Sequence, residues 1–404
     1  MRRNELIAVC IVVMAGVFGC STMRALSILQ GGTQAATGQA EETVPFHTMG
    51  NILLVEGRVS NVTEPLLLIM DTGAFTCVSS EVAARAGFQP STTVSAKGPG
   101  GEKVKTGIVE LGRMSIGKAS VDDLGALAMD MASVERYLGT KVDGIIGNNF
   151  LRQFTVGLNH EEGVVTFYRE RPSKEIPGLL GSVPFRQNIR YGFAPEVALT
   201  LNETRCRGIL DNGLNAFVAV PRSMCSKLGP GTEYAGEGTC MQSLTEPIRD
   251  CGLVVLDSVN LGSIRLHSVP AIVMECRDVM IGGKLLELFN LLIDYEEGSI
   301  SFAANRSVGL PMRICHTGVI VGVGDDSEKI VMGKWDIPSA SAVAPGDTIE
   351  SINGVWSGKM SGMAMDEVLT SCGDTLTAVV RSVDSGRGET ELVPMEIAEL
   401  TVTE

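Results

Sequence analysis

Short apolar runs separated by turn-forming residues follow one another along most of the chain, and this pattern favours strands over helices. The clearest run, residues 66–70, is wholly apolar and predicts a buried strand. A second strand is predicted at residues 53–60, before a turn at 61–65. Helix-tolerant residues are confined to short stretches such as 81–86. The pattern, together with 47 glycines, predicts an all-β body.

A lone carboxylate follows that buried strand. Asp71 is succeeded by Thr72 and Gly73, and a charge delivered to the end of a buried strand is costly unless it is used or compensated. Asp-Thr-Gly is also an ordinary turn, so the tripeptide alone is weak evidence for a site. Its repetition changes this: Asp211, Asn212 and Gly213 again follow an apolar approach, 140 residues later.

Two further landmarks repeat in the same order at nearly the same offset. Val-Pro-Phe at residues 44–46 recurs at 183–185, and Ile-Ile-Gly at 145–147 realigns with Met-Ile-Gly at 280–282. The residues that follow the second landmark, through Phe167 and Phe302, also align, with six identities. Three ordered matches indicate an internal duplication. We therefore predict two lobes, at residues 44–172 and 183–306, joined by a Pro- and Gly-marked linker.

The Asp-Thr-Gly loop and the later apolar-apolar-Gly strand resemble the two signatures of aspartic proteases, most closely those of the viral retropepsin type. The resemblance covers residues 44–306 and implies a single-chain, two-lobed β-barrel fold with a pseudo-twofold repeat. It implies that Asp71 and Asp211 are the catalytic pair, which shares one proton and activates a water molecule. The substrate would be a peptide or protein, the mature protein a monomer, and no metal or cofactor is required.

Each half also carries a Gly-rich segment between its aspartate and the second signature, flanked by strand-like sequence, which predicts a hairpin. In the family such hairpins are flaps that close over the substrate. The flap glycines implied here are Gly98, Gly100, Gly101, Gly236 and Gly238.

The second catalytic loop departs from the family at Asn212. Thr72 and its counterpart normally carry hydroxyls that bond across to the opposite lobe and, with Gly73 and Gly213, hold the loops rigid. Asn212 offers an acceptor oxygen but is longer and brings an NH2 group that must also be satisfied. Two outcomes stay open: the network survives in altered form, or the second lobe has lost catalytic competence.

The first residues are typical of an export signal. Arg2 and Arg3 precede an apolar run at residues 6–19, which is too short for a comfortable membrane span. Residues 17–20 read Val-Phe-Gly-Cys and resemble a bacterial lipobox, which implies lipidation of Cys20; an ordinary signal peptide or a retained short anchor is the alternative. Residues 21–43 have little apolar periodicity and predict a flexible tether. We expect the mature protein in the bacterial cell envelope, facing the periplasm or the outside, with the lipid as its only membrane attachment.

After residue 306 the repeat ends. Pro-Gly-Asp-Thr-Ile at 345–349 and Ile-Asn-Gly at 352–354 look like the middle of a PDZ domain, a partly open β-barrel with short helices. The resemblance covers residues 312–398 and implies a C-terminal peptide ligand, added as a strand to a sheet edge. The only candidate carboxylate-binding loop is at residues 318–322.

Charge and composition exclude some classes of binding partner. A net charge of -14 argues against nucleic acid or an anionic membrane surface as the partner, because either would repel the chain. The four histidines are scattered, without metal-ligand spacing. Eight cysteines lie beyond Cys20, an even number that permits disulfides after export, and Cys240 and Cys251 could bridge the second flap.

Taken together, these observations predict an exported aspartic endopeptidase with a C-terminal PDZ-like module. Two other functions remain open on sequence alone. One is a peptide-binding pseudoprotease, favoured by Asn212; the other is an adaptor lipoprotein that acts through the PDZ-like module.

Overall fold

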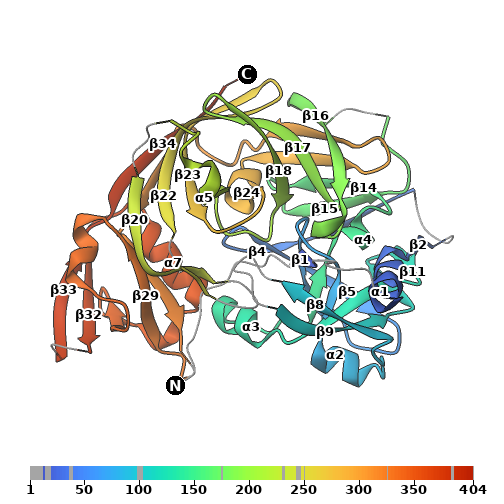
Figure 1. Cartoon of the computed structure of the whole chain (residues 1–404), viewed down its shortest axis with the longest axis horizontal. Coiled ribbons are helices and arrows are strands. Elements are labelled where there is room, and N and C mark those ends of the chain that lie inside the picture. Colours follow the sequence, from blue (N-terminus) through green and yellow to red (C-terminus); the bar gives the residue numbers. More distant parts are fainter. Residues whose placement is uncertain are drawn as a thin grey trace.

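The computed structural model describes residues 12–13, 20–35, 40–97, 103–173, 176–229, 233–242, 247–249, 251–324, 326–383 and 386–403. The described chain is built mainly of strands, as the sequence predicted, and forms two lobes and a C-terminal module. In Figure 1, lobe 1 is blue to cyan, lobe 2 is mostly green to yellow, and the C-terminal module is orange to red at one side of both lobes.

Lobe 1 is a curled sheet with three short helices. The strand predicted at residues 66–70 is β6, Leu66–Met70, whose five residues are almost wholly buried. The other elements of the lobe follow in chain order: β4 (His47–Met49), β5 (Ile52–Val59), β7 (Cys77–Ser79), α2 (Ser80–Arg85), β8 (Thr92–Lys97), β9 (Lys103–Glu110), β10 (Arg113–Ile116), β11 (Ala119–Asp122), β12 (Gly125–Met129), α3 (Ala132–Leu138), β13 (Gly144–Ile146), α4 (Asn148–Leu151), β14 (Thr155–Asn159) and β15 (Val164–Tyr168).

Lobe 2 repeats this order of parts. Its elements are β16 (Leu179–Asn188), η1 (Ile189–Tyr191), β17 (Ala194–Leu201), β18 (Thr204–Asp211), β19 (Val218–Pro221), α5 (Arg222–Cys225), β20 (Glu233–Gln242), β21 (Pro247–Arg249), β22 (Gly252–Leu261), β23 (Ile264–Met274), β24 (Val279–Gly282), α6 (Gly283–Leu286), β25 (Phe289–Asp294) and β26 (Ser299–Ala304).

The predicted repeat is visible in the core. The ring centroids of Phe154 and Phe167 in lobe 1 are 5.5 Å apart, and those of the equivalent Phe289 and Phe302 in lobe 2 are also 5.5 Å apart. Both pairs are edge-to-face, an arrangement that aromatic rings favour. Three of the six identities, one leucine and two phenylalanines in each lobe, are therefore buried core residues, and this equivalent packing confirms the two-lobed repeat.

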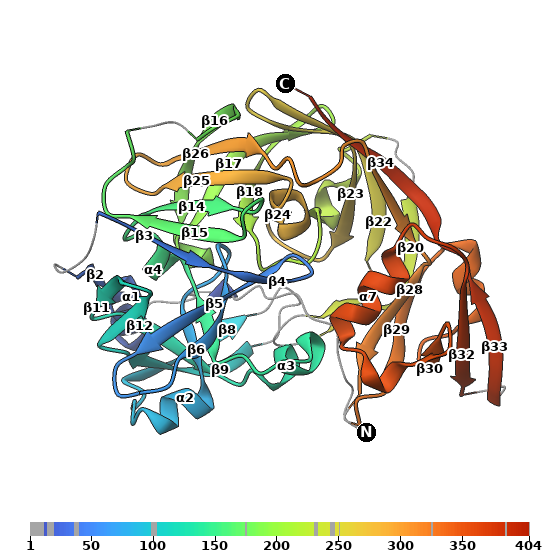
Figure 2. The ribbon, with the colours of Figure 1, turned by 180° about the vertical axis from the view of Figure 1, so that it is seen from behind.

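The lobes are joined by one antiparallel sheet. From lobe 1, β3 (Glu41–Pro45) pairs with β15, and β15 pairs with β14. β14 then pairs with β25 of lobe 2, and the sheet continues through β26 to β16. Figure 2 shows these strands one above another in the upper left part of the molecule, from β16 down to β3. Because the sheet is continuous, the two lobes are fixed relative to each other beneath the site.

The C-terminal module contains a curled sheet and one longer helix. Its elements are β27 (Met312–His316), β28 (Val319–Val323), β29 (Lys329–Trp335), η2 (Pro338–Ala342), β30 (Thr348–Ile352), β31 (Val355–Trp356), η3 (Ser357–Lys359), α7 (Gly362–Thr370), β32 (Leu376–Ser382), β33 (Gly386–Leu392) and β34 (Met395–Thr403). The last strand passes the predicted boundary at residue 398 and pairs with β23, so it ties the module to lobe 2.

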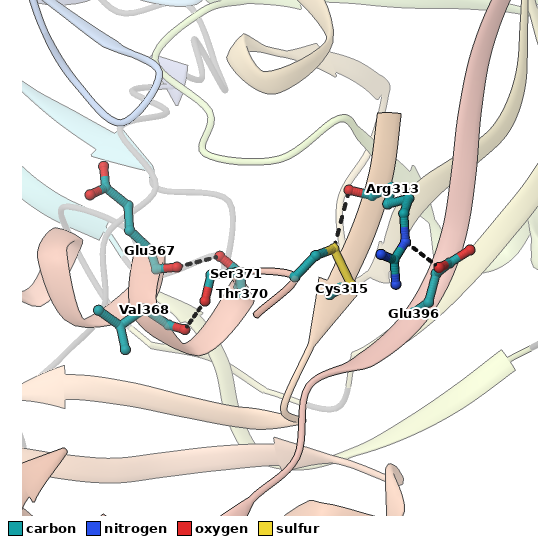
Figure 3. Close-up of a disulfide and its surroundings, with 8 residues drawn as sticks. Arg313, Cys315, Glu367, Val368, Thr370, Ser371 and Glu396 are labelled. Atoms are coloured by element: carbon teal, nitrogen blue, oxygen red, sulfur yellow. Dashed lines mark hydrogen bonds and ion pairs between the residues drawn. A yellow bond between two sulfur atoms is a disulfide. The ribbon is translucent and has the colours of Figure 1, made fainter. Parts of the chain in front are cut away.

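A disulfide between Cys315 and Cys372 joins β27 to the segment after α7. Figure 3 shows Cys315 beside the ion pair of Arg313 and Glu396, whose nearest atoms are 2.6 Å apart. This bridge was not predicted from spacing. The bridge considered between Cys240 and Cys251 stays a prediction, because the side chain of Cys240 lies outside the described part of the chain.

The N-terminal region differs from its prediction. Residues 20–30, expected to begin a flexible tether, form α1 (Cys20–Gln30), and Ala25 and Leu29 on one face of this helix are buried against lobe 1. The carbonyl of Gln30 accepts a 2.8 Å hydrogen bond from Arg152. β2 (Thr33–Gln34) then pairs with β11. The tether prediction is wrong here because Ala25 and Leu29, spaced i, i+4, give the segment an apolar face that a helix can bury.

Most of the predicted export signal lies outside the described residues, apart from β1 (Val12–Val13), which pairs with β8. Among the described helices, none has the length and apolar character needed to cross a bilayer.

Candidate active site

The two aspartates lie at the ends of equivalent strands. Asp71 follows β6, and its backbone N–H donates to the carbonyl of Ile146 in β13, which runs parallel to β6. Asp211 ends β18, which is parallel to β24 in the same way. The apolar-apolar-Gly strands therefore lie alongside the strands that lead into the two loops. Gly147 and Gly282 are required there because a Cβ on either would overlap the carbonyl of Ala74 or Ala216.

The two carboxyl groups face each other across the lobe interface, and both residues are fully buried. A Cβ on Gly73 would overlap the carboxyl of Asp211, and a Cβ on Gly213 would overlap that of Asp71. Each loop glycine thus makes room for the carboxyl of the opposite loop. The backbone N–H of Gly73 also donates to Asp71 Oδ1 at 2.7 Å.

Electrostatics favour a protonated carboxyl in this pair. The pKa of Asp71 is raised well above its usual value, first by burial, then by the charge of Asp211 and by a hydrogen bond between the two side chains. The N–H groups of Gly73 and Gly213 oppose the shift without cancelling it. Two adjacent carboxyls that share one proton can activate water and protonate a leaving group.

Asn212 takes over the bonding role expected of a hydroxyl residue. Its Oδ1 accepts from the Thr72 N–H at 2.7 Å, and its Nδ2 donates to the Met70 carbonyl at 2.7 Å. In the reverse direction, Thr72 Oγ1 accepts from the Asn212 N–H at 3.2 Å and donates to the Leu210 carbonyl at 3.1 Å. Each side chain therefore makes one bond to an N–H and one to a carbonyl of the opposite lobe. The NH2 group that raised doubt in the sequence has a partner.

Two asparagines that the sequence analysis missed support the loops from behind. Asn148 Nδ2 donates to the carbonyls of Thr72 at 2.6 Å and Ala74 at 3.4 Å, and its Oδ1 accepts from the hydroxyl of Tyr295 in lobe 2 at 2.6 Å. Asn51 Nδ2 donates to the carbonyls of Asn212 and Leu214, both at 3.3 Å. The one sequence signal was a polar residue, Asn148, directly after the apolar-apolar-Gly strand.

The two predicted flaps have different outcomes: one lies outside the described residues, and the glycines of the other lie in a strand. Gly98, Gly100 and Gly101 lie outside the described residues, between β8 and β9. Gly236 and Gly238 lie inside β20, which extends to Gln242 and pairs with β21 only from Thr239 onward. These glycines pair with β29 of the C-terminal module, opposite Trp335 and Gly333. The sequence alone gave no sign of that partner, because it is almost 100 residues away.

No group of three or more metal-ligating side chains is found within the described part of the chain. The polar groups around the aspartates are backbone amides and neutral side chains, a donor set suited to holding two carboxyls in place.

A match to a family model agrees with this geometry. Residues 55–150 and 197–285 match the family model described as aspartyl protease. The two matched stretches contain one aspartate loop each, that of Asp71 and that of Asp211. The chain has the two-lobed aspartic protease fold. Among solved structures, basic 7S globulin from soybean is similar over 67% of this chain and 97% of its own, with 12% identity and a TM-score of 0.42. A search of curated proteins found no match.

Proposed function

We propose that this protein is an aspartic peptidase that hydrolyses peptide bonds with water activated between Asp71 and Asp211. The observation that carries the proposal is the pair of buried, adjacent carboxyls held by the reciprocal Thr72 and Asn212 bonds. The match of both lobes to the aspartyl protease family supports it. A pseudoprotease would need no such rigid, proton-sharing pair.

The reaction follows from the pair. The ionised carboxyl removes a proton from water, and the water oxygen bonds to the peptide carbonyl carbon while the protonated carboxyl polarises the carbonyl oxygen. A proton then passes to the nitrogen, and the C–N bond breaks to give a carboxylic acid and an amine. The two aspartates exchange roles through the cycle, so neither is assigned as acid or base.

The test is cleavage of a mixed peptide library by the purified protein between about pH 3 and 8, beside Asp71→Asn and Asp211→Asn. We expect each substitution to abolish cleavage, because each removes the shared proton site while keeping the shape of the side chain. Peptide binding without cleavage by the unaltered protein would instead favour the pseudoprotease. Loss of the cellular phenotype on removal of the module, but not with Asp71→Asn, would favour the adaptor.

We also propose that the protein is exported and lipidated at Cys20. The lipobox-like residues 17–20 motivate this, and the Cys315–Cys372 disulfide supports an oxidising compartment. Labelling with a radioactive fatty acid should mark the unaltered chain and leave Cys20→Ser unmarked. Equal labelling of both, or of neither, would contradict lipidation at this residue.

The PDZ-like character of the module is likewise a proposal. β28 pairs on one side with β29 and lies beside α7, an arrangement that suits strand addition by a peptide.

A further inference from the structure

A cavity of about 290 Å³ lies where lobe 2 meets the C-terminal module. Lobe 2 contributes residues of β22, β23 and α6 to its wall, and the module contributes residues of β27, β28, β29 and α7. Figure 3 shows three of the lining residues of the module, Arg313, Cys315 and Thr370. Neither Asp71 nor Asp211 lines this cavity, so it is distinct from the candidate catalytic pair.

The walls of the cavity are held by bonds within the protein. The disulfide of Cys315 and Cys372 joins β27 to the segment after α7. Trp335 of β29 pairs with Gly236 of β20, and β34 pairs with both β27 and β23. The cavity is therefore formed before any ligand enters, and a ligand that enters it loses little binding free energy to ordering of the protein.

Most of the lining is apolar. Six aliphatic or aromatic side chains that face the cavity are those of Leu253, Ile272, Ile314, Ile320, Trp335 and Ile397. The volume equals that of roughly ten water molecules, at about 30 Å³ each. The cavity is thus suited to one small ligand with an apolar body, of about ten non-hydrogen atoms.

One positive charge in the lining has no fixed counter-ion. Lys284 is half-buried on α6. The carboxyls of Glu287 and Asp366 are close enough to be affected by its charge, but neither is hydrogen-bonded to it. Asp366 Oδ2 instead accepts from Asn215 Nδ2 at 3.4 Å. Within the described part of the chain, the ammonium of Lys284 forms no salt bridge, so it can pair with an anionic ligand.

The two neighbouring carboxyls cancel little of this charge at mildly acidic pH. Burial raises the pKa of Glu287 to about 7, and the charge of Lys284 opposes this shift only in part. Burial also raises the pKa of Asp366, despite Lys284 and the hydrogen bond from Asn215. Both carboxyls therefore favour the neutral form more than exposed carboxyls do, and the lining favours a bound negative charge.

The remaining titratable groups of the lining add no free charge. Burial lowers the pKa of His316 to about 3, so its imidazole is neutral, and its Nδ1 accepts from the Gly318 N–H at 2.7 Å. Burial raises the pKa of Tyr137 well above its usual value, so its hydroxyl is neutral too. Arg313 lies at the exposed rim and pairs with Glu396 at 2.6 Å. The free positive charge is therefore that of Lys284.

We propose that this cavity binds a small carboxylic acid with an apolar body of about eight carbon atoms, its carboxylate beside the ammonium of Lys284 and its body against Trp335 and Ile272. The inference is independent of the proposed peptidase reaction, because neither catalytic aspartate lines the cavity. A bound acid contacts lobe 2 and the module at once, and so stabilises the docking of one on the other.

The two tryptophans of the chain provide a direct measurement. Trp335 is buried and lines the cavity, whereas Trp356 is 61% exposed. The variant Trp356→Phe therefore keeps a single tryptophan, which reports on the cavity. At about pH 6 we expect octanoate to change its fluorescence in a saturable way. Hexanoate, which lacks two methylenes, and uncharged octanamide should each bind at least about tenfold more weakly, and octylamine should not bind.

A second set of variants tests the role of the charge. Lys284→Met keeps the length of the side chain and should weaken octanoate binding at least about tenfold while leaving octanamide unchanged. Lys227→Met, which alters an exposed lysine of the same lobe, is the matched control and should bind as the unaltered protein does. Octanoate affinity should fall about threefold between about pH 6 and 8 as Glu287 ionises, and Glu287→Gln should reduce that fall.

Several results would overturn the inference. These are absence of octanoate binding by both fluorescence and calorimetry, equal binding of octanoate and octanamide, tighter binding of octylamine, or equal loss in Lys227→Met and Lys284→Met. Binding of a peptide through its free carboxyl end, without binding of octanoate, would assign the cavity to chain ends instead. Thermal melting checks that each variant folds. Asp71→Asn should bind octanoate normally, so a failure of the peptidase proposal leaves this test intact.

Discussion

In lobe 1, the carbonyls of Thr72 and Ala74 accept hydrogen bonds from Asn148, which begins α4, just after β13 of the same lobe. In lobe 2, the equivalent carbonyls of Asn212 and Leu214 are bonded by Asn51, which comes from the other lobe. The position equivalent to Asn148 is Gly283, and a Cβ there would overlap Asn51 Nδ2. The two lobes thus place an amide at the same two carbonyls from different parts of the chain.

The two loops therefore receive equivalent hydrogen bonds, but the asparagines that donate them come from non-equivalent positions in the sequence. Loop 1 is held by its own lobe and by Tyr295, through a short bond. Loop 2 depends on lobe 1 for its support, and both of its bonds are long. We therefore expect substitutions at the shared centre to cost most, those behind loop 1 to cost less, and those behind loop 2 to cost least.

The largest effect is expected for Asn212→Ala. It leaves the Thr72 N–H and the Met70 carbonyl buried without partners, at about 1–3 kcal/mol each, so the free energy of unfolding should fall by about 3 kcal/mol. Because the carboxyls then lose their alignment, kcat should fall about hundredfold. Denaturant unfolding and peptide cleavage measure both. Asn212→Thr is the matched control, since the threonine hydroxyl can still accept from the Thr72 N–H. An equal loss of stability and activity in both variants would contradict the conclusion that Asn212 makes the bonds expected of a hydroxyl residue.

Next is Asn148→Ala, which removes the 2.6 Å bond to the Thr72 carbonyl and leaves the buried Tyr295 hydroxyl without its acceptor. We expect the free energy of unfolding to fall by about 2 kcal/mol. Tyr295→Phe removes only the second bond and should cost about 1 kcal/mol. If Tyr295→Phe were the more destabilising of the two, the support of loop 1 would have been assigned to the wrong residue.

Asn51→Ala should cost less, about 1 kcal/mol in unfolding free energy. Its two bonds are 3.3 Å long, and its own Oδ1 is buried without a partner in the described chain, so removing the side chain also removes an unfavourable group. The measurement is a denaturant titration beside Asn148→Ala. A larger loss for Asn51→Ala would reverse the proposed order of the two lobes.

The smallest effect is expected in the pH dependence of Asn212→Thr. The pKa of Asp71 is raised by burial and by Asp211, and Asn212 is not among the causes of that shift. A raised pKa lets the pair keep its single proton to higher pH, so activity should peak between mildly acidic and near-neutral pH in both proteins. The two optima should agree within about half a unit. An optimum below about pH 3 in the unaltered enzyme would contradict the raised pKa.

The sequence predicted the parts of the site that are local and repeated. Residues 66–70 were assigned as a buried strand from their apolar run, and β6 has those bounds. Asp71 and Asp211 were paired because their surroundings recur at one offset, and the structure brings them together. Local patterns suffice where the chain itself supplies both the strand and the catalytic residue.

Contacts between segments that are far apart in the chain could not be predicted from the sequence. Gly236 and Gly238 suggested a hairpin tip, but they allow close pairing with β29, far along the chain. Asn51 gave no signal, because its role depends on a space left by Gly283 in the other lobe. The Cys315–Cys372 bridge depends in the same way on how the module folds, which spacing does not reveal.

The sheet shared by the two lobes has a consequence for how this protein is made. β14 pairs with β25 of lobe 2 along one of its edges. Thr155 of β14 can therefore pair with Asp294 only after that part of lobe 2 has been synthesised. During synthesis, lobe 1 therefore emerges with an open strand edge, and a loop of more than a hundred residues must close before that edge is covered. Because these contacts are non-local, we expect folding to be slow. We therefore expect the pair of Asp71 and Asp211 and the seam between the lobes to form together and late, after nearly three quarters of the polypeptide has been synthesised.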